Sequence, residues 1–134
     1  MTLEVGRPVI KVDVLPVSSG EILGLTFMSQ SGAWRQGIWL GVDGELQIAG
    51  VTADQIEVWT DTAPRSFEVK VLRAEDGLLR LYNIWDSGRG RKRESQSATS
   101  GMLKEQIDGV AIYRCNDIGR EPKFDKLIFQ LSTR

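Results

Sequence analysis

Apolar and polar residues alternate in short runs along most of this chain. Residues 66–73 are the clearest example, with Phe67, Val69 and Val71 on one face and charged residues between them. Residues 9–15 alternate in the same way. Their apolar positions are Ile10, Val12 and Val14. A two-residue period is typical of half-buried strands, so the pattern predicts β-structure along the whole chain.

Turn signals separate these runs. Three Asp-Gly pairs, Asp43-Gly44, Asp76-Gly77 and Asp108-Gly109, stand between strand-like segments. Because Asp-Gly favours the positive φ of a tight turn, each pair predicts a hairpin. About nine or ten short strands follow from this spacing, with no amphipathic helix longer than about two turns. We expect an all-β, single-domain antiparallel β-sandwich (jelly-roll-like) or a barrel.

The length of 134 residues suits one domain, 1–134, with a long polar and basic loop at 86–101. The closing segment, residues 124–131, looks like the last strand of jelly-roll binding modules. That resemblance covers a single strand. It implies a shape of fold and carries no site residues with it.

The charge balance and two residue counts narrow the function. The net charge is −1, which argues against a general attraction to nucleic acid or to an anionic membrane. The chain has no histidine, which removes the commonest general base and the commonest transition-metal ligand. The single cysteine, Cys115, ends an apolar run and is expected in the core. No cofactor is expected.

The first residues, Met-Thr-Leu-Glu-Val-Gly-Arg-Pro, lack the basic and apolar regions of a signal peptide, and no apolar run has the length of a membrane span. One cysteine allows no intrachain disulfide. A cytoplasmic setting fits these features best. The sequence leaves the oligomeric state open.

The 86–101 loop is the most distinctive segment. Arg89, Arg91 and Arg93 lie among glycines and are followed by serines and a threonine. Guanidinium groups and turned backbone amides can bind an anion, a sugar-like molecule or an acidic protein partner. The alternative is a solvated loop whose charges protect a sheet edge. Nucleic acid is disfavoured because no aromatic residue lies between Trp85 and Tyr113.

Polar residues at predicted strand ends extend this site. Trp85, Asp86 and Asn116 are expected to help the three arginines bind and orient a ligand. Paired carboxylates, Asp86 with Asp117, are the alternative, a hydrolase that works without histidine. A weaker alternative is a Ca²⁺ site at Asp86, Asp117 and Asp125. Turn capping explains the same residues without any ligand.

Four tryptophans, Trp34, Trp39, Trp59 and Trp85, complete the candidates. At least two should pack in the core, and Trp34 or Trp59 could form a stacking platform for a sugar. The favoured interpretation is a non-catalytic binding module for an anionic or carbohydrate-like ligand or a protein partner. The hydrolase remains the second hypothesis.

Overall fold

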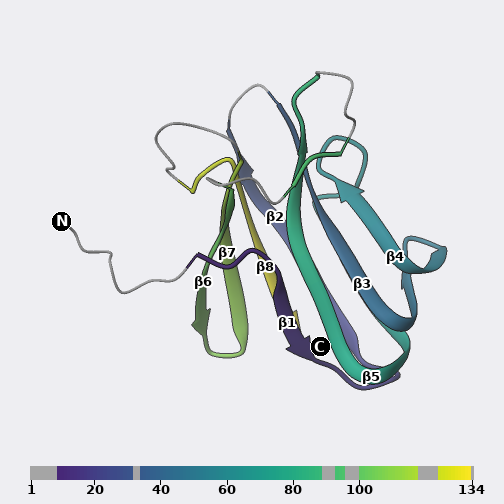
Figure 1. The fold of residues 1–134 in the computed structure, drawn as a ribbon. Helices are drawn as coiled ribbons and strands as arrows, with labels where there is room; N and C mark the ends of the chain where they lie inside the picture. The colour runs from purple at the N-terminus through teal and green to yellow at the C-terminus, as the bar shows by residue number, and fades with distance from the viewer. Residues whose placement is uncertain (1–8, 32–33, 89–92, 96–99, 118–123, 134) are drawn as a thin grey trace.

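The computed structural model describes residues 9–31, 34–88, 93–95, 100–117 and 124–133. These residues form one antiparallel sheet of eight strands without a helix, so the all-β, single-domain prediction is confirmed (Figure 1). The strands are β1 (Asp13–Pro16), β2 (Ile22–Gln30), β3 (Arg35–Ile48), β4 (Val51–Trp59), β5 (Ser66–Asp86), β6 (Gly101–Ile107), β7 (Val110–Asn116) and β8 (Leu127–Thr133).

The sheet curls over on itself, and β1 closes the gap between β5 and β6. Its strand order is β4-β3-β5-β2-β8-β7-β6, and β1 pairs with the second half of β5. A backbone bridge from Ile10 to Met102 then joins the segment before β1 to β6. Figure 1 shows β1 and β5 in front of β8 and β2, which makes two layers around one interior.

Two of the three predicted hairpins are wrong. Asp43-Gly44 lies inside β3 and Asp76-Gly77 lies inside β5. These two long strands pair with each other on both sides of the Asp-Gly positions, and the register shifts there. The pairs therefore form irregularities that bend a long two-stranded ribbon, which curves at the lower end of Figure 1. This is why the described residues form eight strands rather than nine or ten.

The third hairpin is confirmed. Asp108 and Gly109 connect β6 to β7 with φ values of 49° and 81°. Ala49 and Gly50 connect β3 to β4 with nearly the same values, 51° and 83°. Two successive residues of positive φ match the twist of an antiparallel ribbon.

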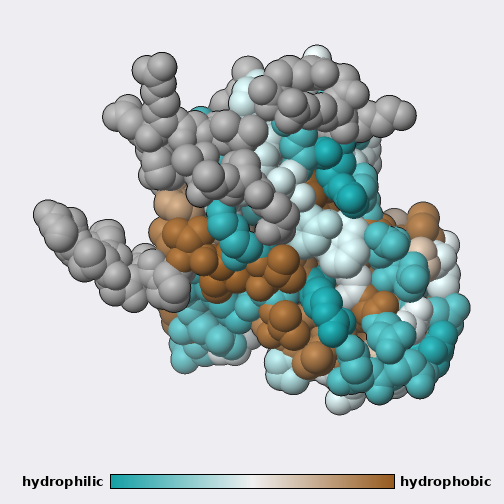
Figure 2. All heavy atoms as spheres, in the orientation of Figure 1, coloured by the Kyte–Doolittle hydropathy of each residue, from teal (hydrophilic) through white to brown (hydrophobic). Residues whose placement is uncertain are grey.

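In most strands, the apolar residues of the alternating pattern are the ones that form the core. Val69 and Val71 of β5 are fully buried, as the pattern predicted, and Tyr113 stacks on Phe129 with ring centroids 4.8 Å apart. The segment around β1 is the exception. Val12 and Val14 are exposed, and the opposite face, which carries Asp13, turns inward. Figure 2 shows hydrophobic side chains gathered over this part of the surface.

Asp13 ties β1 to the far side of the curled sheet. Its Oδ2 accepts a hydrogen bond of 2.6 Å from the Tyr113 hydroxyl and forms an ion pair of 3.0 Å with Lys104. The three side chains are mostly buried. Burial, together with this hydrogen bond, raises the pKa of Tyr113. Charge and hydrogen bonding thus help to hold a short strand in which Val14 faces outward, while Leu15 packs against the core.

Substituting Asp13 with alanine should lower the free energy of unfolding by about 2–4 kcal/mol, because it leaves a buried hydroxyl and a buried ammonium without their acceptor. Urea denaturation checks this. Asp108→Asn, at an exposed turn, is the control and should stay within about 0.5 kcal/mol of the wild type. Equal stability of the two variants would contradict the role given to Asp13.

In the described part of the chain there is no helix long and apolar enough to cross a membrane.

Candidate functional site

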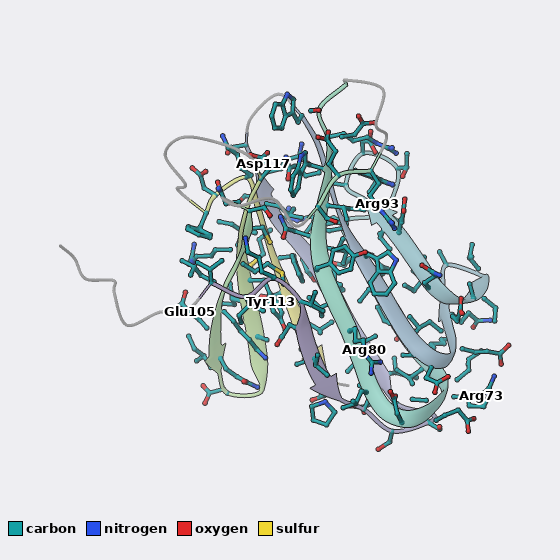
Figure 3. The ribbon with its side chains drawn as sticks, viewed as in Figure 1. Arg73, Arg80, Arg93, Glu105, Tyr113 and Asp117 are labelled. Atoms are coloured by element: carbon teal, nitrogen blue, oxygen red, sulfur yellow. The ribbon has the colours of Figure 1, made fainter. Side chains whose placement is uncertain are left out.

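Several strand ends meet at a single rim. The start of β3 pairs with the end of β5, the end of β7 pairs with the start of β6, and β8 begins beside the ends of β2 and β7. This is the upper end in Figure 3, where Asp117 is labelled. Two hydrogen bonds cross from one layer to the other, from Gln36 to Asp117 and from Asn83 to Asn116.

Every buried polar or charged residue in the described ranges lies at or near this rim. The set is Gln36, Asn83, Glu94, Ser100, Asn116 and Asp117. Most of these groups satisfy one another: Gln36 Nε2 donates to Asp117 at 2.8 Å, and Asn83 Nδ2 donates to the Asn116 carbonyl at 2.9 Å. Glu94 accepts from the backbone N–H and the hydroxyl of Ser87. The first two of these hydrogen bonds join the start of β3 and the end of β5 to the end of β7.

Ionising the Asp117 carboxyl costs free energy because the group is buried. Burial raises the pKa of its carboxyl above the ordinary value, and the Gln36 hydrogen bond and nearby Lys126 offset this only in part. The folded state therefore holds the Asp117 proton more tightly than the unfolded state does. This contribution to stability is present at pH values below the ordinary Asp pKa and is lost as the pH rises through the raised pKa.

Replacing Asp117 with asparagine should remove that pH dependence. We expect the variant to gain stability relative to the wild type as the pH rises from about 4 to about 7, because an amide has no charge to desolvate. Denaturant midpoints across this range are the measurement. Asp108→Asn, which removes an exposed carboxylate from the β6–β7 turn, is the matched control. A constant difference between wild type and Asp117→Asn at all pH values would contradict the expectation.

The residues predicted for ligand binding are divided between different places. Trp85 is 1% exposed and belongs to the interior rather than to an accessible surface. Asn116 is also buried. Arg93 forms an ion pair of 2.9 Å with Glu57 of β4. Arg89 and Arg91 lie outside the described residues.

Asp86 and Asp117 do not share a site. Asp86 ends β5 opposite Arg35, on the outer face of the sheet, where it caps the N–H of Gly88. Gln36, the partner of Asp117, is the next residue along β3 and points to the inner face. Within the described ranges, moreover, no three acidic or cysteine side chains are close enough to hold a metal ion. The structure thus supports neither the carboxylate pair nor the trio with Asp125.

Cys115 is fully buried, as expected of a core residue. Burial raises the pKa of its thiol far above the ordinary value. The thiolate that nucleophilic catalysis requires is therefore suppressed.

An accessible aromatic surface lies on the outer face of β3, β4 and β5. Trp39 and Tyr82, which are opposite each other on β3 and β5, stack with ring centroids 4.8 Å apart and an angle of 18°. Trp39 Nε1 donates to Gln55 of β4 at 3.0 Å. The six-membered edge of the indole lies over Gly41, where a Cβ would be only 2.2 Å from Cη2 of Trp39. Stacking, a hydrogen bond and a glycine therefore fix the orientation of Trp39.

Beside this pair is an open groove of about 360 Å³. We call it the outer groove. It is lined by Trp39, Gly41, Val42, Asp43, Asp54, Gln55, Asp76 and Arg80. Its volume falls within the range of about 300–1,000 Å³ usual for small-molecule sites. Arg80, labelled in Figure 3, forms an ion pair of 2.8 Å with Asp76 and holds the pKa of that carboxyl below its ordinary value.

Arg93 reaches the same face of the sheet, where it pairs with Glu57 of β4. The Arg93–Glu57 ion pair lies close enough to Tyr82 to affect it: burial raises the pKa of Tyr82, Arg93 lowers it, and Glu57 raises it. Arg93 therefore lies near Tyr82, the stacking partner of Trp39.

A second tryptophan on this face has different partners. The ring of Trp59 covers Gly37, and the Arg35 guanidinium lies 4.3 Å from the centroid of Trp59 while binding Asp61. The Trp59 ring is therefore already covered by the Arg35 guanidinium. The platform that the sequence assigned to Trp34 or Trp59 is better supplied by Trp39. The sequence signal for Trp39 was Gly41, which follows two positions later and therefore lies on the same face of the strand.

Comparisons with known proteins show little at the level of sequence. No family model matches the chain, and no curated protein matches it. Among solved structures, the lectin CV2L of Chromobacterium violaceum, in complex with alpha-methyl-fucoside, aligns with a TM-score of 0.46 and 15% identity. The alignment covers 92% of this chain and 96% of the lectin chain.

Proposed function

We propose that this protein is a non-catalytic carbohydrate-binding module whose site is the outer groove. The observation that carries the proposal is the Trp39–Tyr82 stack at an open groove whose other walls supply hydrogen-bonding groups. An aromatic ring offers a flat apolar surface to the C–H face of a sugar ring, and carboxylates, amides and guanidinium groups suit the hydroxyls around it.

The geometry of the groove fits this task. Trp39 is held by Gln55 and Tyr82 before any ligand arrives, so little side-chain freedom has to be lost on binding. Gln55, Asp54 and Asp76 present acceptors, and Arg80 presents donors, around the same opening. The sequence favoured a binding module over an enzyme. The separation of Asp86 from Asp117 and the buried state of Cys115 support that preference.

The test is a titration with a panel of neutral, amine-bearing and acidic monosaccharides, followed by ¹⁵N NMR of the backbone and of the indole N–H groups. We expect the Trp39 indole and residues of the outer groove to shift. Trp39→Ala should weaken binding about 5- to 30-fold, which corresponds to the about 1–2 kcal/mol of a stacking contact.

Trp59→Ala is the matched control, because Trp59 lies on the same face and does not line the groove. It should bind like the wild type. The proposal fails if no sugar shifts the groove resonances, or if the shifts lie only at the rim around Arg93 and Glu94. The second result would direct attention to the 86–101 loop as the ligand site.

A further inference from the structure

The charges that line the outer groove suggest which sugars it can accept. Each strand contributes to the charged wall: β3 provides Asp43, β4 provides Asp54, and β5 provides Asp76 and Arg80. Three carboxylates and one guanidinium therefore surround an opening whose remaining walls are an indole, an amide and apolar groups. These charges come from three different strands, so the tertiary structure and not a local sequence run brings them together.

Two of the four charges neutralise each other. Arg80 and Asp76 are 2.8 Å apart, and the hydrogen bond from Arg80 is the main reason for the lowered pKa of Asp76. Asp76 also accepts from the backbone N–H of Leu78, so its two oxygens both have donors within the protein. This pair contributes shape and hydrogen bonds to the groove and almost no net charge.

The other two carboxylates are available to a ligand. Asp43 and Asp54 are exposed, and within the described residues neither forms a side-chain hydrogen bond or an ion pair. The cation near Asp43 is Arg73, which forms its own ion pair of 2.8 Å with Glu75. The groove thus keeps two uncompensated negative charges next to Trp39.

We infer that the outer groove selects a sugar that carries a free, protonated amine. This inference rests on the proposed function and adds the chemical class of its ligand. An ammonium group can pair with Asp43 or Asp54 and is also attracted by the face of an indole ring. A sugar with a carboxylate or sulfate would meet two like charges in the same opening, and a neutral sugar would form no ion pair with either.

The experiment compares three probes on the full chain by NMR titration at low salt: glucosamine, N-acetylglucosamine and glucuronate. The first two differ at one position, where a charged amine is replaced by a neutral amide. We expect glucosamine to bind at least about 5-fold more tightly than N-acetylglucosamine, and glucuronate to bind most weakly. At about 0.5 M salt the preference for the amine should shrink, because exposed charges are screened.

The double variant Asp43→Asn/Asp54→Asn keeps an oxygen acceptor at each position and loses both charges, so its affinities for glucosamine and N-acetylglucosamine should become equal. Glu68→Gln/Asp108→Asn changes the net charge by the same amount away from the groove and should keep the preference. Equal affinities of wild type for the amine and its N-acetyl form would overturn the inference and leave sugar binding intact. If none of the three probes, nor any other sugar, perturbs the groove, the proposed function itself fails.

Discussion

Replacing Gly44 with alanine is expected to destabilise the protein by about 3 kcal/mol or more. Gly44 lies where the β3–β5 ribbon bends, with φ +155°, and a Cβ there would be 2.1 Å from the carbonyl oxygen of Arg73. The obstacle is backbone, which cannot rotate away as a side chain can. Relieving it requires the ribbon to open at its corner, so strain and lost pairing add together.

Gly50→Ala is the control for this experiment. Gly50 also has a positive φ, +83°, but nothing lies within 4 Å of the position of its added Cβ. It should cost only about 1 kcal/mol, the usual penalty for a non-glycine residue in this conformation. Denaturant unfolding followed by tryptophan fluorescence measures both. A loss of less than about 1 kcal/mol for Gly44→Ala would show that the corner is not held by this close approach.

The second large effect is expected on binding. In Gly41→Ala the new methyl group would occupy the space of the Trp39 indole, so the ring has to move. The Trp39–Tyr82 stack and the hydrogen bond to Gln55 depend on the present ring position and should be lost together. Sugar binding should therefore fall more than about 10-fold, a change of about 1.4 kcal/mol.

The stability cost of Gly41→Ala should be smaller than its effect on binding. Gly41 has no positive φ, and the atoms in the way belong to a partly exposed side chain that can rotate outward. The indole N–H resonance of Trp39 reports the movement without any ligand. Gly20→Ala, where the added Cβ meets nothing, is the control for binding. Unchanged affinity in a Gly41→Ala protein with a shifted indole signal would separate Trp39 from the ligand.

The candidate site was only partly accessible to sequence reasoning. Asn116 and Asp117, which the sequence placed at strand ends, lie at one rim, and there they belong to a buried hydrogen-bond network. The outer groove was missed because its members are far apart in the chain. Asp43, Asp54 and Asp76 each look like ordinary turn residues until β3, β4 and β5 lie side by side.

Alternation alone determined the class of this protein. A two-residue period in a chain without helical patterns indicates antiparallel strands around one core, and it placed Val69 and Val71 inside correctly. It could not decide what each Asp-Gly pair does. The same positive-φ chemistry makes a hairpin at Asp108-Gly109 and bends a continuous ribbon at Asp43-Gly44 and Asp76-Gly77.

Only the tertiary structure could choose between these outcomes, because a strand continues or turns according to the partner beside it. β5 continues past Asp76-Gly77 because β3 accompanies it on both sides of the bend, while β2 and β1 pair with its two halves. The same long-range pairing turned the Asp13 face inward, stacked Tyr82 on Trp39, and brought Trp39 and three carboxylates to one groove. Local patterns fix which residues can be strands, and the pairing of distant strands decides which faces and which side chains meet.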